Sequence, residues 1–391
     1  MRSFHFTDTD LEYLQKRGEF SSRFLDRLRS LKFAGEVYAM PEGTVVFPHE
    51  PLIQVAAPIV EGQLFETFIL NQIHCESVLA AKASRVVTAA QGRIVVDFGS
   101  RRSHGTDAAL KVARATYLAG GEGTSNLLAG KRYGIPVFGT MAHSYIQAHD
   151  DEYQAFEAFA ARYPETTLLI DTYDTLDGVR NVIPLRQKLN ARFRVKAVRL
   201  DSGDLGRLAI ETRRMLDEAS LRSVKIFASS GLDECKIQKL VASRAPIDGF
   251  GVETSLAVSE DAPALDMAYK LVEYAGKGRL KLSTKKVLYP GRKQGFRQYE
   301  NGRIVRDVIG RFDESLPGKP LLERVFQPGQ PCCHATLTES RQLLRDQIEH
   351  LPPQLIKLSR PEASFPVLFS DRLQADLPMR RSEIAAAHVS V

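Results

Sequence analysis

Short apolar runs that end in polar or glycine-rich residues recur along the middle of the chain. From the second run on, they recur about every 30 residues, and the segments between them have the pattern of helices. This is the period of a strand-plus-helix unit in a parallel sheet. The runs are Arg93–Gly99, Ile135–Thr140, Thr167–Asp171, Val195–Asp201, Val224–Gly231 and Ile247–Val252.

We call this series of six apolar runs and the helical segments between them the ladder. It predicts an α/β protein in which the strands close toward a barrel. In such a barrel the C-terminal ends of the strands lie on one face, where barrel enzymes hold their reactive groups. We therefore expect chemistry at this face. The polar residues at the predicted strand ends are Arg101, Arg102, His143, Asp171, Arg199, Asp201, Ser229 and Ser230.

The regions on either side of the ladder have a different pattern. The N-terminal region begins with a charged helical stretch, and apolar spacing predicts a helix from about Glu61 to Ala89. After residue 300 the chain is rich in Pro and Gly, which predicts one helix over Arg341–His350 and then a coil-like tail. Three short runs near the N-terminus predict antiparallel strands, at Val37–Met40, Gly43–Pro48 and Pro51–Ala57.

Several ladder helices have recognisable ends. Thr106 is the expected N-cap of a helix over Asp107–Leu118, and Ser202 of one that begins near Asp204. Asp174 or Thr175 can cap the helix that runs to about Leu189.

Composition excludes several classes of protein. Four cysteines without a CxxC pair indicate neither a disulfide framework nor a zinc ribbon. The N-terminus lacks the basic start and apolar run of a signal peptide. No segment approaches the ~18 apolar residues of a membrane span. We expect a cytoplasmic protein with no membrane contact.

The net charge of +6 is a modest basic excess, spread along the chain except for residues 277–297. A nucleic-acid binder would concentrate its charge, so no nucleic-acid partner is expected. The basic segment alternates polar and apolar residues, which predicts a hairpin between Arg279–Ser283 and Phe296–Tyr299. Its lysines fit a solvated edge or a basic rim that attracts a polyanionic small molecule.

The segment Arg199–Asp204 combines an arginine with two carboxylates at a predicted strand end. Asp201 and Asp204 suit a site for a sugar and its magnesium, because carboxylate oxygens are hard ligands. Arg199 supplies a fixed cation for phosphate. The alternative for Asp204 is that it interacts with the dipole of the following helix.

Three other strand ends carry candidate chemistry. Arg101 and Arg102 follow Phe98 and suit a carboxylate or phosphate, while Phe98 itself fits a core residue equally well. His143 can act as a general base or phosphoryl acceptor, or can be structural. The loops Ala228–Asp233 and Gly249–Ser255 suit a phosphate held by backbone N–H groups.

Taken together, these residues resemble the nicotinate phosphoribosyltransferase family. The resemblance implies an irregular, open α/β barrel over residues 91–300. It also implies a second α/β domain, built from an N-terminal part, residues 1–90, and a C-terminal part, residues 301–391. The matching segments are Phe98–Gly105, Gly123–Lys131, Gly139–Ser144, Val198–Leu205, Ala264–Val272 and Pro290–Gln294.

The resemblance also implies the reaction. Members of this family join nicotinate to 5-phosphoribosyl-1-pyrophosphate, giving nicotinate mononucleotide and pyrophosphate in NAD biosynthesis. ATP hydrolysis through a phosphohistidine drives the reaction. The resemblance thus implies ATP as co-substrate, Mg²⁺ as cofactor and a homodimer.

Roles for individual residues follow from the same resemblance. His143 matches the histidine that takes phosphate from ATP, and Phe98 matches the aromatic residue that stacks on the pyridine ring. Arg101 lies near the nicotinate and pyrophosphate groups, with Arg102 as a helper. By the resemblance, Arg199 and Asp201 face the phosphoribosyl group, and Ser230, Gly231 and Gly251 fall where its 5-phosphate is held. Thr254 is a further candidate for substrate binding, and Asp201 and Asp204 are the candidates for Mg²⁺.

The chain departs from the family pattern in two places. It starts downstream of an opening segment whose tyrosine reaches the partner subunit's nicotinate, so one wall of the pocket is expected to be missing or completed differently. Glu253 stands where the family has glycine in a Gly-Val-Gly-Thr phosphate loop. These two departures leave open a catalytically weakened binding subunit. A separate alternative keeps the fold and changes the base to nicotinamide or quinolinate.

Glu253 gives a testable prediction. A carboxylate repels a phosphate dianion, and a side chain limits how closely the backbone can approach it. We therefore expect Glu253→Gly to bind phosphoribosyl pyrophosphate more tightly than the wild type, as measured by the dissociation constant. An unchanged constant would contradict this prediction.

Overall fold

The computed structural model describes residues 4–282, 288–333, 335–359 and 364–389. The fold divides into two compact units. Unit 1 consists of residues 1–71, 267–355 and 361–391, so it draws on both ends of the chain. Unit 2 consists of residues 72–266 and 356–360 and contains the predicted ladder.

Unit 2 is built on a parallel sheet with the strand order β4-β3-β8-β7-β6-β5. All five strand pairings are parallel. Since β4 and β5 lie at opposite edges, the sheet is an open half-barrel, which confirms the predicted fold class. Its strands are β3 (Ile94–Asp97), β4 (Gly123–Thr124), β5 (Thr167–Leu169), β6 (Ala197–Leu200), β7 (Lys225–Ala228) and β8 (Gly249–Val252).

Five of the six predicted strands are present, but the prediction for Ile135–Thr140 is wrong. This segment forms only an isolated bridge between Val137 and Thr124 of β4. Pro136 has no N–H to donate, so a regular ladder cannot continue through it. Its carbonyl still accepts a hydrogen bond from the Thr124 amide at 3.1 Å.

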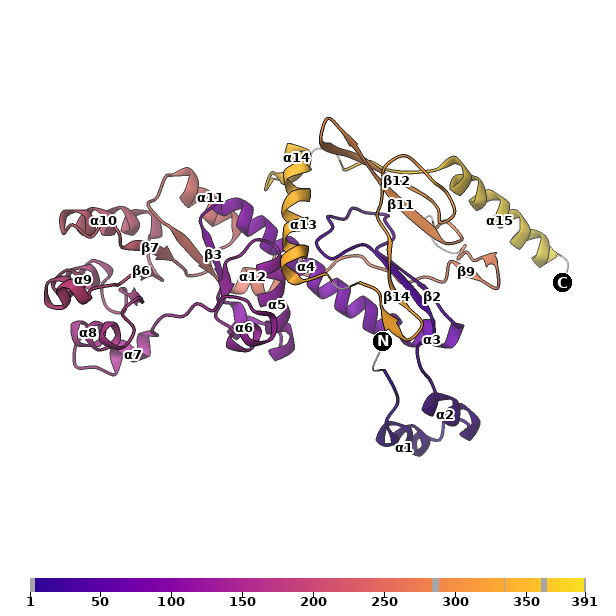
Figure 1. Cartoon of the computed structure of the whole chain (residues 1–391), viewed down its shortest axis with the longest axis horizontal. Coiled ribbons are helices and arrows are strands. Elements are labelled where there is room, and N and C mark those ends of the chain that lie inside the picture. Colours follow the sequence, from indigo (N-terminus) through magenta and orange to yellow (C-terminus); the bar gives the residue numbers. More distant parts are fainter. Residues whose placement is uncertain (1–3, 283–287, 334, 360–363, 390–391) are drawn as a thin grey trace. The chain divides into compact units, whose positions relative to one another are not determined.

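Helices cover the half-barrel, and Figure 1 shows α9 and α10 beside β6 and β7. α4 spans Glu66–Ala90, and its residues from Gln72 on belong to unit 2. The other helices of unit 2 are η1 (Gly99–Arg102), α5 (Thr106–Leu118), α6 (Leu127–Tyr133), α7 (His143–Gln147), α8 (Glu152–Arg162), α9 (Thr175–Leu189), η2 (Asn190–Arg192), α10 (Leu205–Glu218), α11 (Glu234–Ala242) and α12 (Thr254–Val258).

The helix caps correct two predictions. Asp174 caps α9 as expected, by accepting from two backbone amides. Thr106 is the first residue of α5, not its N-cap, and Gly105 precedes it. Ser202 does not cap α10 either, because Asp204 takes that place and Ser202 bonds to Asp171 instead.

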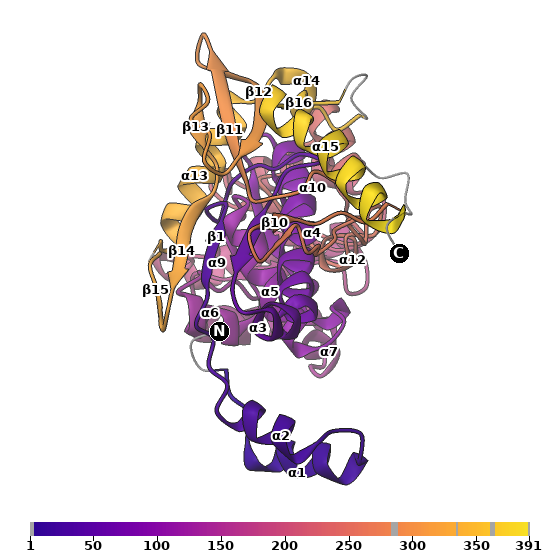
Figure 2. The same cartoon turned by 90° about the vertical axis from the view of Figure 1, so that its right-hand side faces the viewer.

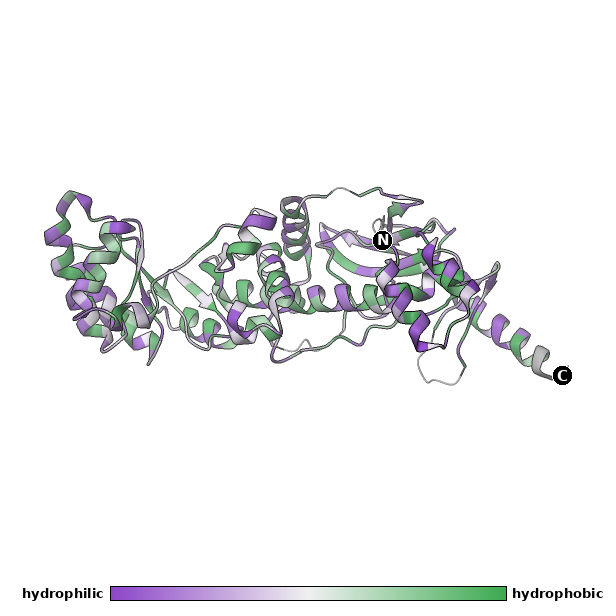
Figure 3. Ribbon diagram, turned by 90° about the horizontal axis from the view of Figure 1, so that it is seen from below, coloured by the Kyte–Doolittle hydropathy of each residue, from purple (hydrophilic) through white to green (hydrophobic). Residues whose placement is uncertain are grey.

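The core of unit 2 lies between the strands and their covering helices. Val198, Ile226 and Phe250 of the sheet are fully buried, as are Ala209 and Leu216 of α10. Figure 3 shows hydrophobic and hydrophilic residues alternating around the surface helices. This burial fixes the strand ends, because each strand is held on both sides by apolar packing.

Unit 1 contains two four-stranded sheets, β15-β14-β1-β2 and β13-β11-β12-β16, and a small β9-β10 pair. Figure 2 shows β11, β12 and β13 together, and α15 contacts β12. The strands are β1 (Glu36–Ala39), β2 (Ile53–Ala56), β9 (Glu273–Tyr274), β10 (Lys277–Gly278), β11 (Lys293–Glu300), β12 (Arg303–Arg311), β13 (Lys319–Pro320), β14 (Glu323–Gln327), β15 (Gln330–Pro331) and β16 (Val367–Phe369). The helices are α1 (Asp8–Arg17), α2 (Ser22–Arg29), α3 (Ile59–Leu64), α13 (Leu337–His350), α14 (Pro353–Ile356) and α15 (Asp371–Val389).

Three predictions for unit 1 are wrong. Gly43–Pro48 is not a strand. The partners of β11 are β12 and β13, one on each side, so among the described residues Phe296–Tyr299 does not pair with the segment that begins at Arg279; residues 283–287 lie outside the described residues. The tail holds the 19-residue helix α15 instead of coil.

A buried ion pair holds the second sheet of unit 1 together. Arg297 and Asp307 are 1% and 0% exposed and face each other across β11 and β12. The Arg297 guanidinium also donates to the Gln347 side chain and the Val45 carbonyl, each at 2.8 Å. A buried charge is tolerated when it is paired and hydrogen-bonded in this way.

No helix among the described residues is both long and apolar enough to cross a membrane.

Candidate active site

Arg199 is the centre of a polar network at the C-terminal edge of the half-barrel sheet. Each nitrogen of its guanidinium donates to a different residue: Nε to Ser229 at 2.8 Å, Nη1 to Thr140 at 3.0 Å and Nη2 to Asp201 at 3.0 Å. The same guanidinium lies 5.1 Å from the centre of the Phe98 ring. One side chain therefore joins residues from four parts of the chain.

Asp201 faces both Arg199 and His143. Its Oδ1 accepts from the Ser229 hydroxyl at 2.5 Å, and its Oδ2 lies 3.5 Å from His143 Nε2. Burial favours the neutral form, but hydrogen bonds from Ser229 and Arg199 and the charge of Arg199 outweigh it, so the pKa of Asp201 lies below its ordinary value. Asp201 is a fixed carboxylate at neutral pH.

His143 is held on both sides of its ring. Nδ1 lies 3.1 Å from the Thr172 hydroxyl, while Nε2 faces Asp201. The side chain is 43% exposed, because His143 is the first residue of the short helix α7. An oriented and accessible imidazole suits transfer of a proton or a phosphoryl group.

Asp171, at the end of β5, supports the Asp201 loop. Its Oδ2 accepts from the Asp201 amide at 2.8 Å and from the Ser202 hydroxyl at 2.6 Å. Its Oδ1 is buried and has no hydrogen-bond partner among the described residues. An unsatisfied buried carboxylate oxygen is costly, so this oxygen suits a water molecule or a cation.

Asp97 fixes the turn that carries the arginine pair. This carboxylate is 0% exposed and accepts from the Gly99 amide and the Thr124 hydroxyl, each at 2.7 Å. Burial raises its pKa to about 6. The turn also needs glycine at position 99, because a Cβ there would lie 2.8 Å from Ala257 Cβ.

Arg101 forms an ion pair with Glu253. Its Nη2 lies 3.0 and 2.9 Å from the two carboxylate oxygens. The Glu253 side chain is 10% exposed and the Arg101 side chain 66%. Arg102 is exposed beside it, at the end of η1. The residue singled out as a departure from the family pattern thus contacts the first of the two predicted arginines.

The predicted phosphate residues fall in different environments. Ser230 and Gly231 follow β7, and both are exposed. Their φ angles are 89° and 55°, and a positive φ is unusual for serine. Gly251 is buried within β8, where a Cβ would lie 2.5 Å from the Phe98 ring, so this glycine makes room for the ring. Thr254 is exposed at the start of α12.

Asp204 stays apart from the network. Its Oδ1 accepts from the Arg207 amide at 3.1 Å, so the carboxylate caps α10. Within the described residues, no group of three or more His, Cys, Asp or Glu side chains is placed to hold a metal ion. A magnesium ion held by protein side chains alone therefore does not fit these residues.

The structure brings together Phe98, His143, Arg199 and Asp201. Sequence reasoning missed the hydroxyl groups that orient them, on Thr140, Thr172 and Ser229. Ser229 had been noted only as a strand-end residue. The sequence signal for such a hydroxyl group is a polar residue directly after a buried strand. Threonine is too common at strand ends for this signal to identify Thr140 or Thr172.

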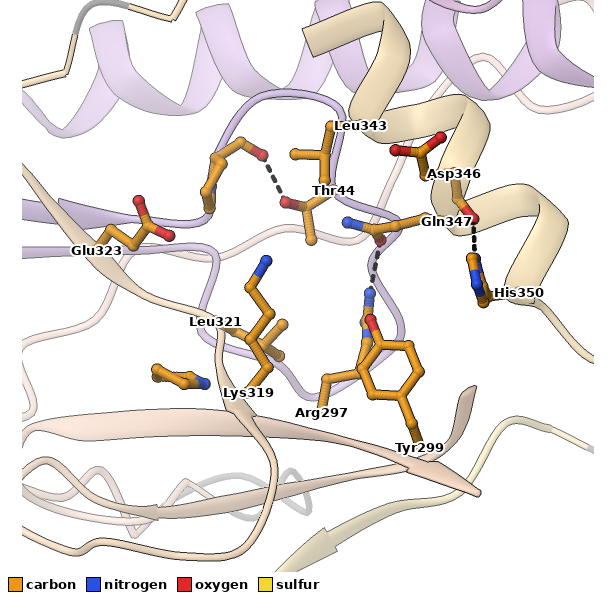
Figure 4. A pocket seen from close by; sticks show the side chains of 12 residues that line it. Thr44, Arg297, Tyr299, Lys319, Leu321, Glu323, Leu343, Asp346, Gln347 and His350 are labelled. Carbon is orange, nitrogen blue, oxygen red and sulfur yellow. Dashed lines mark hydrogen bonds between the residues drawn. The ribbon is translucent and has the colours of Figure 1, made fainter. Parts of the chain in front are cut away.

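A separate pocket of about 210 Å³ lies within unit 1 (Figure 4). Tyr299, Lys319 and His350 line it, together with Arg297. Arg297 is already paired with Asp307 and Gln347, so its guanidinium is not free to bind an anionic substrate, and the pocket lining does not include His143, Arg199 or Asp201. The network around Arg199 is the stronger candidate.

Comparison with known proteins places the chain in a family. Residues 1–74 match the family model described as the nicotinate phosphoribosyltransferase (NAPRTase) N-terminal domain, and residues 94–284 match that of the NAPRTase family. The chain is 58% identical to nicotinate phosphoribosyltransferase pncB2 of Mycobacterium tuberculosis, over 99% of this chain and 84% of the relative. It is 37% identical to the nicotinate phosphoribosyltransferase of Bacillus subtilis, over 98% of this chain and 85% of the relative.

A solved structure agrees with these matches. The crystal structure of human nicotinic acid phosphoribosyltransferase superimposes with a TM-score of 0.85 at 28% identity, covering 97% of this chain and 89% of the human one. The fold and the site define a phosphoribosyltransferase of the open-barrel type. The chain belongs to the nicotinate phosphoribosyltransferase family, which confirms the resemblance seen in the sequence.

Asp97 gives a prediction about stability. Its pKa is about 6 in the folded state and near 3.8 otherwise, so the folded state binds the extra proton between these values. This stabilisation is complete below about pH 4 and is lost as the pH rises through 6. A shift of about two pKa units changes the free energy of unfolding by roughly 3 kcal/mol at most between low and high pH.

Urea unfolding of wild type and Asp97→Asn between pH 4 and pH 7 measures this effect. The wild type should lose more unfolding free energy with rising pH than the variant, which cannot ionise at position 97. Asp204→Asn, a change at an exposed helix cap, serves as the control and should keep the wild-type slope. Equal slopes for wild type and Asp97→Asn would contradict the assignment.

Proposed function

We propose that this chain joins nicotinate to 5-phosphoribosyl-1-pyrophosphate, giving nicotinate mononucleotide and pyrophosphate in NAD biosynthesis, with coupled ATP hydrolysis. The main support is that a chain matching this family along most of its length also gathers Phe98, His143, Arg199 and Asp201 at one edge of its sheet.

The pyridine ring is proposed to stack on Phe98. The Phe98 ring is half-buried against Gly251, and the Arg199 guanidinium lies over it. An aromatic ring that is held in one place is a good platform for a second aromatic ring. Arg101 and Arg102 then bind the carboxylate of nicotinate or the pyrophosphate, because paired guanidinium groups can donate several hydrogen bonds to such anions.

Displacement at the anomeric carbon needs charge stabilisation more than proton transfer. The ribose develops oxocarbenium character and the leaving pyrophosphate gains charge, which the exposed side of Arg101 can stabilise while Arg199 holds the surrounding polar groups in place. The neutral pyridine nitrogen must be positioned, not deprotonated. This demand fits a site in which the Asp201 carboxylate is held by Arg199 and Ser229 and is not free to act as a base.

Magnesium is proposed to arrive with the pyrophosphate. Mg²⁺ usually keeps several waters and binds through substrate phosphates and one or two carboxylates. Asp201 is one such carboxylate, and the unpartnered Asp171 Oδ1 is a second oxygen at the same edge. Asp204, assigned to the metal from the sequence, would have to give up its helix cap. When bound, Mg²⁺ would neutralise charge on the leaving pyrophosphate.

The 5-phosphate is proposed to lie at the loops after β7 and β8. Ser230, Gly231 and Thr254 are exposed there, and Lys236 donates to the Gly231 carbonyl at 2.5 Å. Gly251 contributes by admitting the Phe98 ring, not by contact with the phosphate. We also propose a homodimer located in the cytoplasm, as the family resemblance implies.

Product formation tests the proposed function. The purified chain would be incubated with labelled nicotinate, phosphoribosyl pyrophosphate and magnesium, with and without ATP. Nicotinate mononucleotide should form, and ATP should increase its amount. Competition with unlabelled nicotinamide and quinolinate identifies the preferred base. Folded protein that gives no product would refute the proposal.

His143 is the proposed phosphoryl acceptor, so His143→Ala should abolish stimulation by ATP. The ATP-independent rate should remain within a few-fold of wild type, because the Arg199 network does not need the imidazole. Initial rates with and without ATP measure both quantities. His149→Ala removes another histidine six residues along the chain and should keep the stimulation. ATP stimulation that survives in His143→Ala would contradict this role.

A further inference from the structure

The Arg101–Glu253 ion pair joins the ends of two neighbouring strands. Arg101 lies in the turn after β3, and Glu253 is the first residue after β8. The two strands pair in parallel up to Asp97 and Val252, and the Phe98 amide continues the ladder by donating to the Val252 carbonyl at 2.9 Å. The pairing of β3 with β8 therefore brings the Arg101 and Glu253 side chains together at the C-terminal ends of these two strands.

The two partners differ in how far water reaches them. The Glu253 side chain is 10% exposed, whereas the Arg101 side chain is 66% exposed. A carboxylate that is largely withdrawn from water needs a positive partner, and both of its oxygens contact Arg101 Nη2. Arg101, by contrast, still presents an open side to a ligand.

An anion that binds at Arg101 must therefore compete with Glu253. If the ligand replaces Glu253 as the partner of the Arg101 guanidinium, the Glu253 carboxylate stays buried without a positive partner, which is unfavourable. If Glu253 stays in place, the ligand meets an arginine whose charge is already neutralised, next to a second negative charge. Both outcomes weaken the binding of an anion, and neither affects a neutral ligand of the same shape.

We propose that Glu253 sets the charge selectivity of the substrate site, by acting as an internal anion that occupies Arg101. The inference rests on the proposed function, which brings a pyridine carboxylate and a pyrophosphate to this arginine. It goes beyond repulsion of the 5-phosphate, because the group that Glu253 competes with is the anion at Arg101. Its effect is weaker binding of that anion, nicotinate or pyrophosphate, while binding of neutral nicotinamide is unaffected.

The test uses Glu253→Gln, which removes the charge and keeps the size and hydrogen-bonding capacity of the side chain. Dissociation constants would be measured by calorimetry for nicotinate, nicotinamide and inorganic pyrophosphate, each titrated separately. Glu165→Gln is the matched control: it makes the same change in net charge, and Glu165 pairs with Lys196 before the N-terminal ends of β5 and β6.

Glu253→Gln should bind at least one of the two anions about fivefold more tightly than the wild type, with nicotinamide unchanged. The anion that responds identifies which substrate group meets Arg101. Adding Arg101→Gln should cancel the gain, because no cation is then released. Glu165→Gln should behave like the wild type. If Glu253→Gln does not fold, the same dissociation constants would be measured for Glu253→Gly, which has the glycine of the family pattern at this position.

Two results would overturn the inference. One is unchanged binding of both anions. The other is an equal gain for nicotinamide, which would indicate a change in packing and not in charge. The proposed function is judged separately, by product formation in the wild-type chain, so failure of one does not decide the other.

Discussion

The site depends on the way Arg199 distributes its hydrogen bonds. A guanidinium that is largely withdrawn from water must satisfy several donors at once, and Arg199 does so with groups from three different strand ends or loops: Thr140, Asp201 and Ser229. Asp201 is in turn held by Asp171 at the end of β5. Because these contacts cross from one strand to the next, the edge of the sheet behaves as one preorganised surface. Preorganised charge of this kind is the largest usual contribution to catalysis.

The other physical constraint is the number of carboxylates at this edge. Asp97 is buried and supports the arginine turn, while Asp201 and Glu253 each neutralise one arginine. A site for anionic substrates would ordinarily leave its cations free. Here Arg199 is fixed in place by its carboxylate, whereas Arg101 keeps an exposed face. We therefore propose different roles for the two arginines: Arg199 organises the site and Arg101 meets the ligand.

The sequence predicted the ladder well because each strand of a parallel sheet is buried on both faces and reads as a continuous apolar run. Its failures have local causes. Pro136 broke the strand over 135–140, and Ser202 and Asp204 are both good caps, so the sequence could not choose between them. The partner of β11 was missed because alternation identifies a strand but not its neighbour.

The candidate site was predictable to a similar degree. Residues at strand ends could be grouped because parallel strands share one edge, and the family resemblance supplied roles for them. The ion pair of Arg101 and the orienting hydroxyl groups of Thr140 and Thr172 could not be foreseen, since they join positions up to 152 residues apart in the chain. Such contacts depend on side-chain directions, which no local pattern contains.

The network around Arg199 and Asp201 is the proposed catalytic centre. The most direct measurement is the initial rate of nicotinate mononucleotide formation by Asp201→Asn, with thermal unfolding of the same protein recorded alongside. The exchange keeps the shape of the side chain and removes the charge that faces Arg199 and His143. We expect a rate at least about a hundredfold lower than that of the wild type, in a variant that still folds. A folded variant with a near-normal rate would contradict it.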